Sequence, residues 1–128
     1  MSQSSVAFSG ELRYAARVSL ETPLAPVLPL KIAAAVAHFD SEQVGWRLLE
    51  PNGDAPRSYT ARILFESAFQ LAPVVHVGVS GFDIENSDAA RLRVRVTHVD
   101  HAGFEVELET WLATRVWSVD VSWLAIGN

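Results

Sequence analysis

Apolar and polar residues alternate with a period of two in short runs along the chain from Gly45 onward. This alternation is typical of half-buried β-strands, because successive side chains of a strand point to opposite faces of the sheet. Turn-forming residues separate the runs, and no helical periodicity interrupts them. We therefore predict an all-β fold, a six-stranded antiparallel β-sandwich, with strands near 45–50, 59–66, 73–80, 91–98, 104–111 and 116–126.

The fourth and fifth runs predict a hairpin, and its two faces agree on one register. Pairing Arg95 with Glu107, and Arg93 with Glu109, places opposite charges side by side on one face. In the same register the valines between the arginines meet the apolar residues between the glutamates. The alternation also places His98 on the apolar face of this hairpin.

The phase of the alternation predicts which side chains fill the space between the two sheets. In the last run Trp117 is in phase with Trp123, so its indole is expected in the core. The run 73–80 is nearly uncharged on its second face as well, which predicts that another subunit covers that face. The expected core contains Val94, Val96, Phe104, Val106, Trp111, Val121 and Trp123.

Residues 1–43 have a different pattern and are predicted to form an N-terminal extension before a domain at 44–128. Residues 11–20 alternate like one further strand, prolines follow, and Leu30–Phe39 is expected to form a short helix. About forty residues are too few to build a core of their own. Three interpretations stay open: the extension packs on the sandwich, assembles with copies of itself, or attaches the protein to a larger body.

The size and composition of the chain exclude several classes of protein. Its 128 residues fit one compact domain. The net charge of −5 disfavours nucleic-acid binding, and the absence of cysteine excludes disulfides, thiolate metal sites and a cysteine nucleophile. The chain starts without a secretory signal pattern, and its longest apolar stretch, 24–39, is interrupted by Lys31 and prolines. We expect a soluble protein without membrane insertion, either cytoplasmic, non-classically secreted or associated with a particle.

No motif in the chain predicts catalysis, a metal or a resident cofactor. There is no serine nucleophile motif, glycine-rich phosphate loop or metal motif. His98, Asp100 and His101 are close in sequence but lack a distant third or fourth ligand, and the polar loop 83–88 lacks the glycine and final glutamate of a calcium loop. The sequence therefore favours a non-enzymatic binding protein.

A set of aromatic and polar motifs extends over the region from Asp54 to Ile126, with Gly45-Trp46 upstream. The motifs are Phe65…Phe69…Pro73-Val74-Val75, Phe82-Asp83-Ile84-Glu85, Arg91, Gly103-Phe104, Thr110-Trp111, Thr114-Arg115-Val116-Trp117 and Ser122-Trp123. In these motifs the region resembles the H-type lectin family of the snail agglutinins and the C-terminal domain of the discoidins. The resemblance implies a six-stranded sandwich that assembles as a trimer, sometimes doubled to a hexamer. It also implies galactose or N-acetylgalactosamine binding in shallow sites between neighbouring subunits.

The resemblance places the family's sugar-binding aspartate on Asp54, in a loop shared with Asn52 and Gly53, and the arginine that donates to the sugar on Arg91. A carboxylate can accept two hydroxyl hydrogens, and vicinal sugar hydroxyls present them at matching spacing. Simpler interpretations stay open, because an aspartate after Asn-Gly is often a turn former and Arg91 can be an ordinary solvated charge.

Two further positions follow from the same resemblance. Trp117 matches an aromatic residue that borders the sugar, which competes with its expected place in the core. Leu112 stands where the snail members have a histidine after the Thr-Trp pair. This difference removes a hydrogen-bond donor near the acetamido group, so we expect galactose or an apolar-substituted sugar in preference to strict N-acetylgalactosamine selectivity.

The sequence pattern and the resemblance leave two candidate functions of different classes. The first is a lectin that binds galactose-type glycans. The alternative is a structural trimerisation or attachment module, for example of a phage-like particle or fibre, that keeps the fold without binding sugar. The N-terminal extension and Leu112 favour the alternative, and a glycan-binding measurement discriminates between the two.

Overall fold

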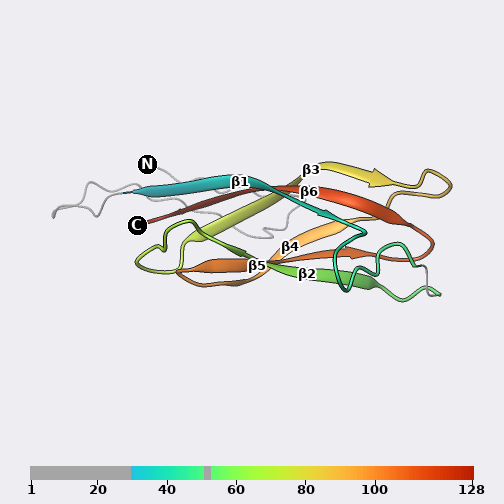
Figure 1. Ribbon diagram of the computed structural model, residues 1–128, viewed down its shortest axis with the longest axis horizontal. Helices are drawn as coiled ribbons and strands as arrows, with labels where there is room; N and C mark the ends of the chain where they lie inside the picture. The colour runs from blue at the N-terminus through green and yellow to red at the C-terminus, as the bar shows by residue number, and fades with distance from the viewer. Residues whose placement is uncertain (1–29, 51–52) are drawn as a thin grey trace, which may run out of the picture.

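The computed structural model describes residues 30–50 and 53–128, so the strand predicted at 11–20 lies outside the described part. Within these residues six strands form two three-stranded antiparallel sheets, which confirms the predicted sandwich (Figure 1). One sheet has the order β1-β6-β3 and the other β2-β5-β4. The described residues contain no helix long and apolar enough to cross a membrane. The strands are β1 (Lys31–Asp40), β2 (Arg57–Leu64), β3 (Val74–Ile84), β4 (Arg93–Val99), β5 (Gly103–Thr110) and β6 (Val116–Gly127).

The β4–β5 hairpin has the predicted register. Arg95 lies opposite Glu107, and Arg93 lies opposite Glu109. Each pair forms an ion pair with an N···O distance of 2.7 Å. Since the arginine of each pair is about half exposed at the surface, each pair contributes only about 0–1 kcal/mol to the free energy of unfolding, so the effect of the pairs is mainly on register.

A β-bulge places His98 on the face opposite to the predicted one. The register of β4 against β5 shifts between Val96 and His98. The imidazole is therefore exposed, and its Nδ1 lies 2.9 Å from the Glu105 carboxylate. The prediction that His98 faces the apolar side was wrong, because an inserted residue reverses the side-chain alternation beyond it.

Leu30–Phe39 was expected to form a helix, but most of this segment lies in strand β1. β1 pairs antiparallel with β6 over its whole length, from Lys31 opposite Gly127 to Asp40 opposite Ser118. Its alanine-rich sequence favours a helix in isolation, yet propensity is weak and pairing with a neighbouring strand overrides it. The sandwich therefore includes residues that precede position 44.

The first predicted strand, 45–50, is also wrong, because this stretch forms a series of turns. Gly45 has a φ of 88°, in the left-handed region that glycine adopts without a Cβ clash. The amide of Trp46 donates to the carbonyl of Gln43 at 3.1 Å and closes one of the turns. The count of six strands was right only because β1 takes the place of this segment.

Aromatic side chains fill the core at one end of the sandwich. The indole of Trp123 packs against the rings of Phe65 and Phe104, with centroid distances of 5.8 and 5.3 Å. Phe69 meets Phe65 edge to face at 4.9 Å. Of the predicted core residues, Phe104, Val106, Val121 and Trp123 are buried, whereas Val94 and Val96 are partly buried against the core.

Two tryptophans that were expected in the core lie at its margin. Trp111 is half-buried, and the Arg93 guanidinium lies 5.0 Å from the centroid of its ring. Trp117 is 42% exposed, whereas the neighbouring Val116 is fully buried. A register shift between β3 and β6 at this point leaves Trp117 without a partner in β3, so the phase that places Trp123 inside does not extend to it.

The outward surface of the β1-β6-β3 sheet is mostly apolar, and we call it the apolar face. Val36 and Val74 on its edge strands are 63% and 76% exposed. The register places His76 and Gly78 of β3 on the same face. The nearly uncharged second face predicted for the run 73–80 is part of this surface. The other exposed large apolar residues on it are Ile32, Leu124 and Ile126.

A histidine between two carboxylates closes one end of the apolar face. His38 Nδ1 lies 2.5 Å from the carboxylate of Asp120, and Nε2 lies 3.2 Å from that of Asp40. The hydrogen bond with Asp120 and the negative charges of both carboxylates raise the pKa of His38 above its ordinary value. The apolar face therefore ends in a polar, partly exposed cluster.

Candidate functional site

Three loops meet at one end of the sandwich, on the right in Figure 1, and we call this region the loop end. The amide of Val116 donates to the carbonyl of Leu48 at 2.9 Å, and the amide of Glu85 donates to that of Arg115 at 3.0 Å. These bonds tie the first loop to the start of β6 and the second loop to the third. The loops are 41–56, of which 51 and 52 are not described, 85–92 and 111–115.

Arg57, the first residue of β2, is buried at the loop end although it is charged. It is 1% exposed. Its Nη1 donates to the carbonyls of Leu48 at 3.0 Å and Arg47 at 3.4 Å. Its Nη2 donates to the carbonyls of Leu112 at 2.9 Å and Thr114 at 2.8 Å. Burial, together with nearby positive charges, lowers the pKa of Arg57, but a guanidinium stays charged at physiological pH. One side chain thus holds two loops at once.

Leu112 has a strained backbone at this point. Its φ of 57° lies in the left-handed region, and it is the one non-glycine residue with positive φ in the described part of the chain. A side chain with a Cβ carries a cost of about 1–2 kcal/mol there. Such strain persists where neighbouring groups hold it, and it is frequent at binding sites. Here the bond from Arg57 to the Leu112 carbonyl holds the conformation.

Arg91 connects the second loop to the third. Its Nη1 donates to the hydroxyl oxygen of Thr114 at 2.9 Å and to the carboxylate of Asp88 at 3.2 Å. The Thr114 hydroxyl in turn donates to the carbonyl of Ala89 at 2.6 Å. The Ala89 amide and the Arg91 guanidinium both lower the pKa of Asp88. The Arg91 side chain is 22% exposed, so it is positioned by these bonds while part of it faces solvent.

The other predicted binding residues lie at or beside the loop end. Gly53 and Asp54 are exposed in the first loop, and Gly53 has a φ of 66°. Asn52 lies outside the described residues. Trp117 is at the start of β6, and its carbonyl accepts from the amide of Ser41 at 3.0 Å.

The fold brings together segments that are far apart in sequence, namely those with Asp54, Arg91, Leu112 and Trp117. It does not join the two main candidates directly: within the described residues no hydrogen bond or ion pair links Asp54 to Arg91. An exposed carboxylate, a positioned guanidinium and an indole form a set suited to a neutral polyhydroxyl ligand. The described residues contain no cluster of His, Asp or Glu that could hold a metal ion.

Arg57 was not singled out by the sequence analysis, although the pattern contained a signal for it. Arg57 is in phase with Tyr59, Ala61 and Ile63, whose side chains pack against the core. A charged residue on the inward face of a strand is rare unless its donors are satisfied. The phase was sufficient to predict a buried arginine, but not which carbonyl groups it binds.

One sequence relative comes from Fuscovulum blasticum and is called ATP synthase subunits region ORF 7. It is 33% identical over 76 residues, which span 59% of this chain and 66% of the relative. That name describes a genomic region and says nothing of an activity.

Two solved structures of discoidin II from Dictyostelium discoideum, one recombinant and one wild-type, share the fold. Each has a TM-score of 0.64 and 18% sequence identity, and they cover 83% and 82% of this chain. The chain spans only 41% and 39% of the two discoidin II chains. At this identity the likeness establishes the architecture alone.

The family model of the H-type lectin domain matches residues 60–126. The match begins within β2 and ends within β6, so it includes Arg91, the strained Leu112 and the third loop. It covers more than half of the chain and lies within the sandwich fold shared with discoidin II, without β1. The protein therefore belongs to the H-type lectin domain family.

Proposed function

We propose that this protein is a non-enzymatic lectin that binds galactose-type glycans at the loop end. One observation carries the proposal. A domain of the H-type lectin family holds its first and third loops around the buried Arg57; the exposed Asp54 belongs to the first loop, and Arg91 of the second loop is positioned against the third by Thr114.

In this proposal Asp54 accepts hydrogen bonds from ring hydroxyls and Arg91 donates to them. An ionised carboxylate has only acceptors and a guanidinium has only donors, so together they complement neighbouring hydroxyl groups. Gly53 shapes the loop, and Trp117 offers an apolar surface to the C–H face of the sugar. Because Asp54 is exposed, the site is shallow, and we expect a Kd of about 0.1–1 mM for one monosaccharide. Clustered glycans on an oligomer raise the apparent affinity by about 10²-fold or more.

Leu112 bears on which sugar binds. Its side chain has no hydrogen-bond donor, so it offers nothing to the carbonyl of an acetamido group. We therefore propose plain galactose or an apolar-substituted galactose as the ligand, in preference to N-acetylgalactosamine.

Alanine at either main candidate residue is expected to abolish glycan binding. A hydrogen bond to a charged group contributes about 1.5–3 kcal/mol, so Asp54→Ala and Arg91→Ala should each reduce affinity by more than about tenfold. The measurement is binding of galactose-terminated glycans on an array, together with a thermal melt. The melting temperature of Asp54→Ala should stay unchanged, since its side chain is exposed.

Matched controls are available at the opposite end of the sandwich. Glu66→Ala and Arg62→Ala remove the same charges from exposed positions there, and both should bind as the wild type does. If Asp54→Ala binds like the wild type, the site assignment is wrong. If the wild type binds no glycan, the structural trimerisation or attachment module replaces the lectin.

We also propose that the protein assembles as a homotrimer, or as a hexamer of two trimers, through the apolar face. An exposed apolar patch of this kind on a sheet favours association, because burial removes it from water. His76 and Gly78 lie on this face without a charged residue beside them in β3, which suits close approach of copies around an axis.

A glutamate at Gly78 is expected to dissociate the assembly. A Cβ at Gly78 would meet no atom within 4 Å, so the isolated subunit accommodates the change. Copies around a common axis would bring like charges together. Light scattering should return three or six times 14.0 kDa for the wild type and 14.0 kDa for Gly78→Glu. Gln70→Glu, which adds the same charge in an exposed loop, should assemble normally, and a monomeric wild type would refute the trimer.

A further inference from the structure

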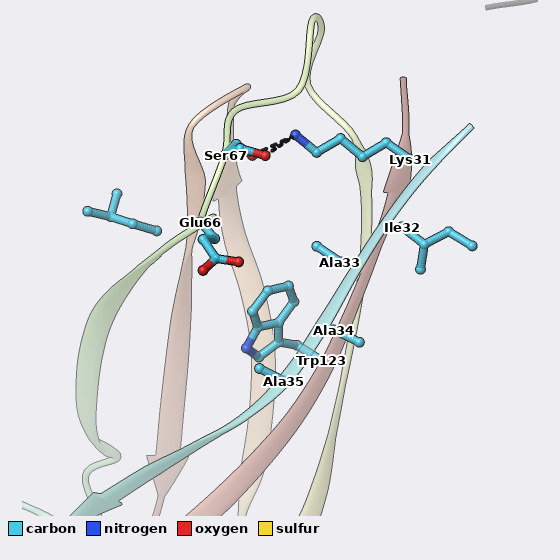
Figure 2. Close-up of a pocket in the computed structure, with 9 residues that line it drawn as sticks. Lys31, Ile32, Ala33, Ala34, Ala35, Glu66, Ser67 and Trp123 are labelled. Carbon is cyan, nitrogen blue, oxygen red and sulfur yellow. Dashed lines mark hydrogen bonds between the residues drawn. The ribbon is translucent and has the colours of Figure 1, made fainter. Parts of the chain in front are cut away.

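A groove of about 500 Å³ opens between the edge strands of the two sheets, at the end opposite the loop end. One wall is the beginning of β1, and the other is the segment Leu64–Ser67 at and after the end of β2. Figure 2 shows Ala33 and Ala35 on the groove side of β1, beside the indole of Trp123. The groove therefore leads from the surface to the aromatic core.

The groove exists because β1 presents small side chains where the opposite strands present large ones. Ala33, Ala35 and Ala37 alternate on the inward side of β1, opposite Ala125, Trp123 and Val121 of β6. Alanine methyl groups do not reach across to β2, so Trp123 retains 9% of its surface exposed. An additional apolar strand beside β1 would fill this space.

The outer edge of β1 is unpaired within the described residues. β1 is the terminal strand in the order β1-β6-β3, so one side of its backbone has no ladder partner among them. Unpaired strand edges bind further strands unless they are short, charged or covered. Between Lys31 and Asp40 this edge has ten residues and no proline.

Lys31 closes one end of the groove. Its Nζ donates to the carbonyls of Ser67 and Ala68 at 2.8 and 2.7 Å and to the Ser67 hydroxyl at 2.6 Å (Figure 2). It also lies 4.8 Å from the centroid of Phe69. Lys31 is the first residue of β1, so the described part of the chain begins beside the groove.

Residues 11–20 have the pattern that such an additional strand requires. Alternate positions are apolar, with Leu12, Tyr14, Ala16, Val18 and Leu20 in one phase. The other phase contains Arg13 and Arg17. A strand with this pattern buries one face and exposes the other.

We propose that residues 11–20 of the same chain bind as an antiparallel strand along the free edge of β1 and cover the groove. Arg13 then lies opposite Asp40, beside the acidic end of the apolar face. In that register Val18 is opposite Ala35 and Leu20 is opposite Ala33, so larger side chains fill the space the alanines leave.

The length of the connection favours the same chain over a second copy. Ten residues, 22–31, connect Glu21 to its partner Ile32 in this register, and they contain the three prolines at 23, 26 and 29. A short linker gives an effective concentration in the millimolar range, which exceeds the concentration of a second copy in dilute solution.

A cysteine pair tests the register, because the chain has no cysteine of its own. Directly opposite residues of antiparallel strands have Cα atoms about 4.5–5.5 Å apart, within the range that a disulfide accepts. In the full chain, Val18→Cys with Ala35→Cys should form an intramolecular disulfide on mild oxidation, at a rate independent of protein concentration. The readout is the mass and mobility of the oxidised chain without reductant.

A second pair and a mismatched pair complete the experiment. Ala16→Cys with Ala37→Cys belongs to the same register on the groove side, away from the apolar face and with little change in side-chain size, and it should also link within one chain. Val18→Cys with Val36→Cys points to opposite faces and should remain reduced. Absence of a disulfide in both matched pairs, covalent dimers in place of intramolecular links, or equal linking of the mismatched pair would each overturn the proposal. None of these outcomes depends on glycan binding.

Discussion

Replacing Arg57 by methionine should lower the free energy of unfolding by about 3–5 kcal/mol, the loss typical of removing one partner from a buried charged network. Methionine preserves much of the volume of the arginine stem but has no donor. The carbonyls of Arg47, Leu48, Leu112 and Thr114 would lose the bonds that the guanidinium now makes. Buried acceptors without a partner lose their hydration without compensation. Urea unfolding followed by tryptophan fluorescence measures the effect.

The matched control is the same substitution on the same strand. Arg62 is exposed at the other end of β2, where it forms a surface ion pair with Asp100 at 2.9 Å. Arg62→Met should therefore cost only about 0–1 kcal/mol. Equal losses from the two variants would mean that the buried network at the loop end does not stabilise the fold. Arg57→Lys should lie between them, because an ammonium group cannot reach the same carbonyls with a planar fork.

Truncation of Trp123 to alanine should also lower the free energy of unfolding by about 3–5 kcal/mol, through lost transfer free energy and the cavity that remains. Its indole contacts the rings of Phe65 and Phe104, and it faces the inner side of β1. The surrounding strands are paired on both sides of β6, so they cannot collapse fully into the space. Chemical denaturation with the same protocol measures the loss.

Trp117→Ala is the control for Trp123→Ala, since both residues belong to β6. Trp117 is 42% exposed at the start of the strand, so its loss should change stability by about 1 kcal/mol or less. If Trp117→Ala destabilises the protein as much as Trp123→Ala, the bulge does not separate a surface tryptophan from a core one. In that case the original phase argument, which placed both residues inside, would be right.

The loop end and the core are physically coupled through Arg57. The residue begins β2, and its neighbours on the inward phase, Tyr59 and Ala61, pack against the hydrophobic core. Its guanidinium donates hydrogen bonds to backbone carbonyls of the first and third loops. Exposed candidates such as Asp54 can therefore change without loss of stability, whereas the residue that orders their loops cannot.

The hairpin of β4 and β5 shows what alternation can predict. Charge complementarity on one face and apolar matching on the other specify the same register, and that register is the one observed. Side chains alternate between the two faces, so a slip of one residue would move every side chain to the wrong face. Both the ion pairs and the apolar contacts would then be lost. The all-β class and the buried positions of Phe104, Val106 and Trp123 follow from the same periodicity.

The errors have causes that the local pattern does not contain. The segment 30–39 is rich in alanine, which helices and strands both accept, and only the neighbouring β6 makes it a strand. The turns at 45–50 mimic alternation because Trp46 and Leu48 are both buried, although they lie in a loop. His98 and Trp117 point to solvent because of register shifts between paired strands. Such shifts depend on the pairing of two strands and not on the sequence of one of them.

The sequence by itself determined the all-β class, the register of the β4–β5 hairpin and the residue types offered for the candidate site, because strand periodicity and side-chain type are local properties. Only the tertiary structure decided that Asp54, Arg91 and Leu112 share one end of the sandwich, and that a buried arginine holds the first and third loops there. Every residue has a backbone carbonyl, so the sequence does not show which carbonyls from distant loops will surround the arginine. Their position is set by how the two sheets pack, so the organisation of the loop end is a property of the folded chain.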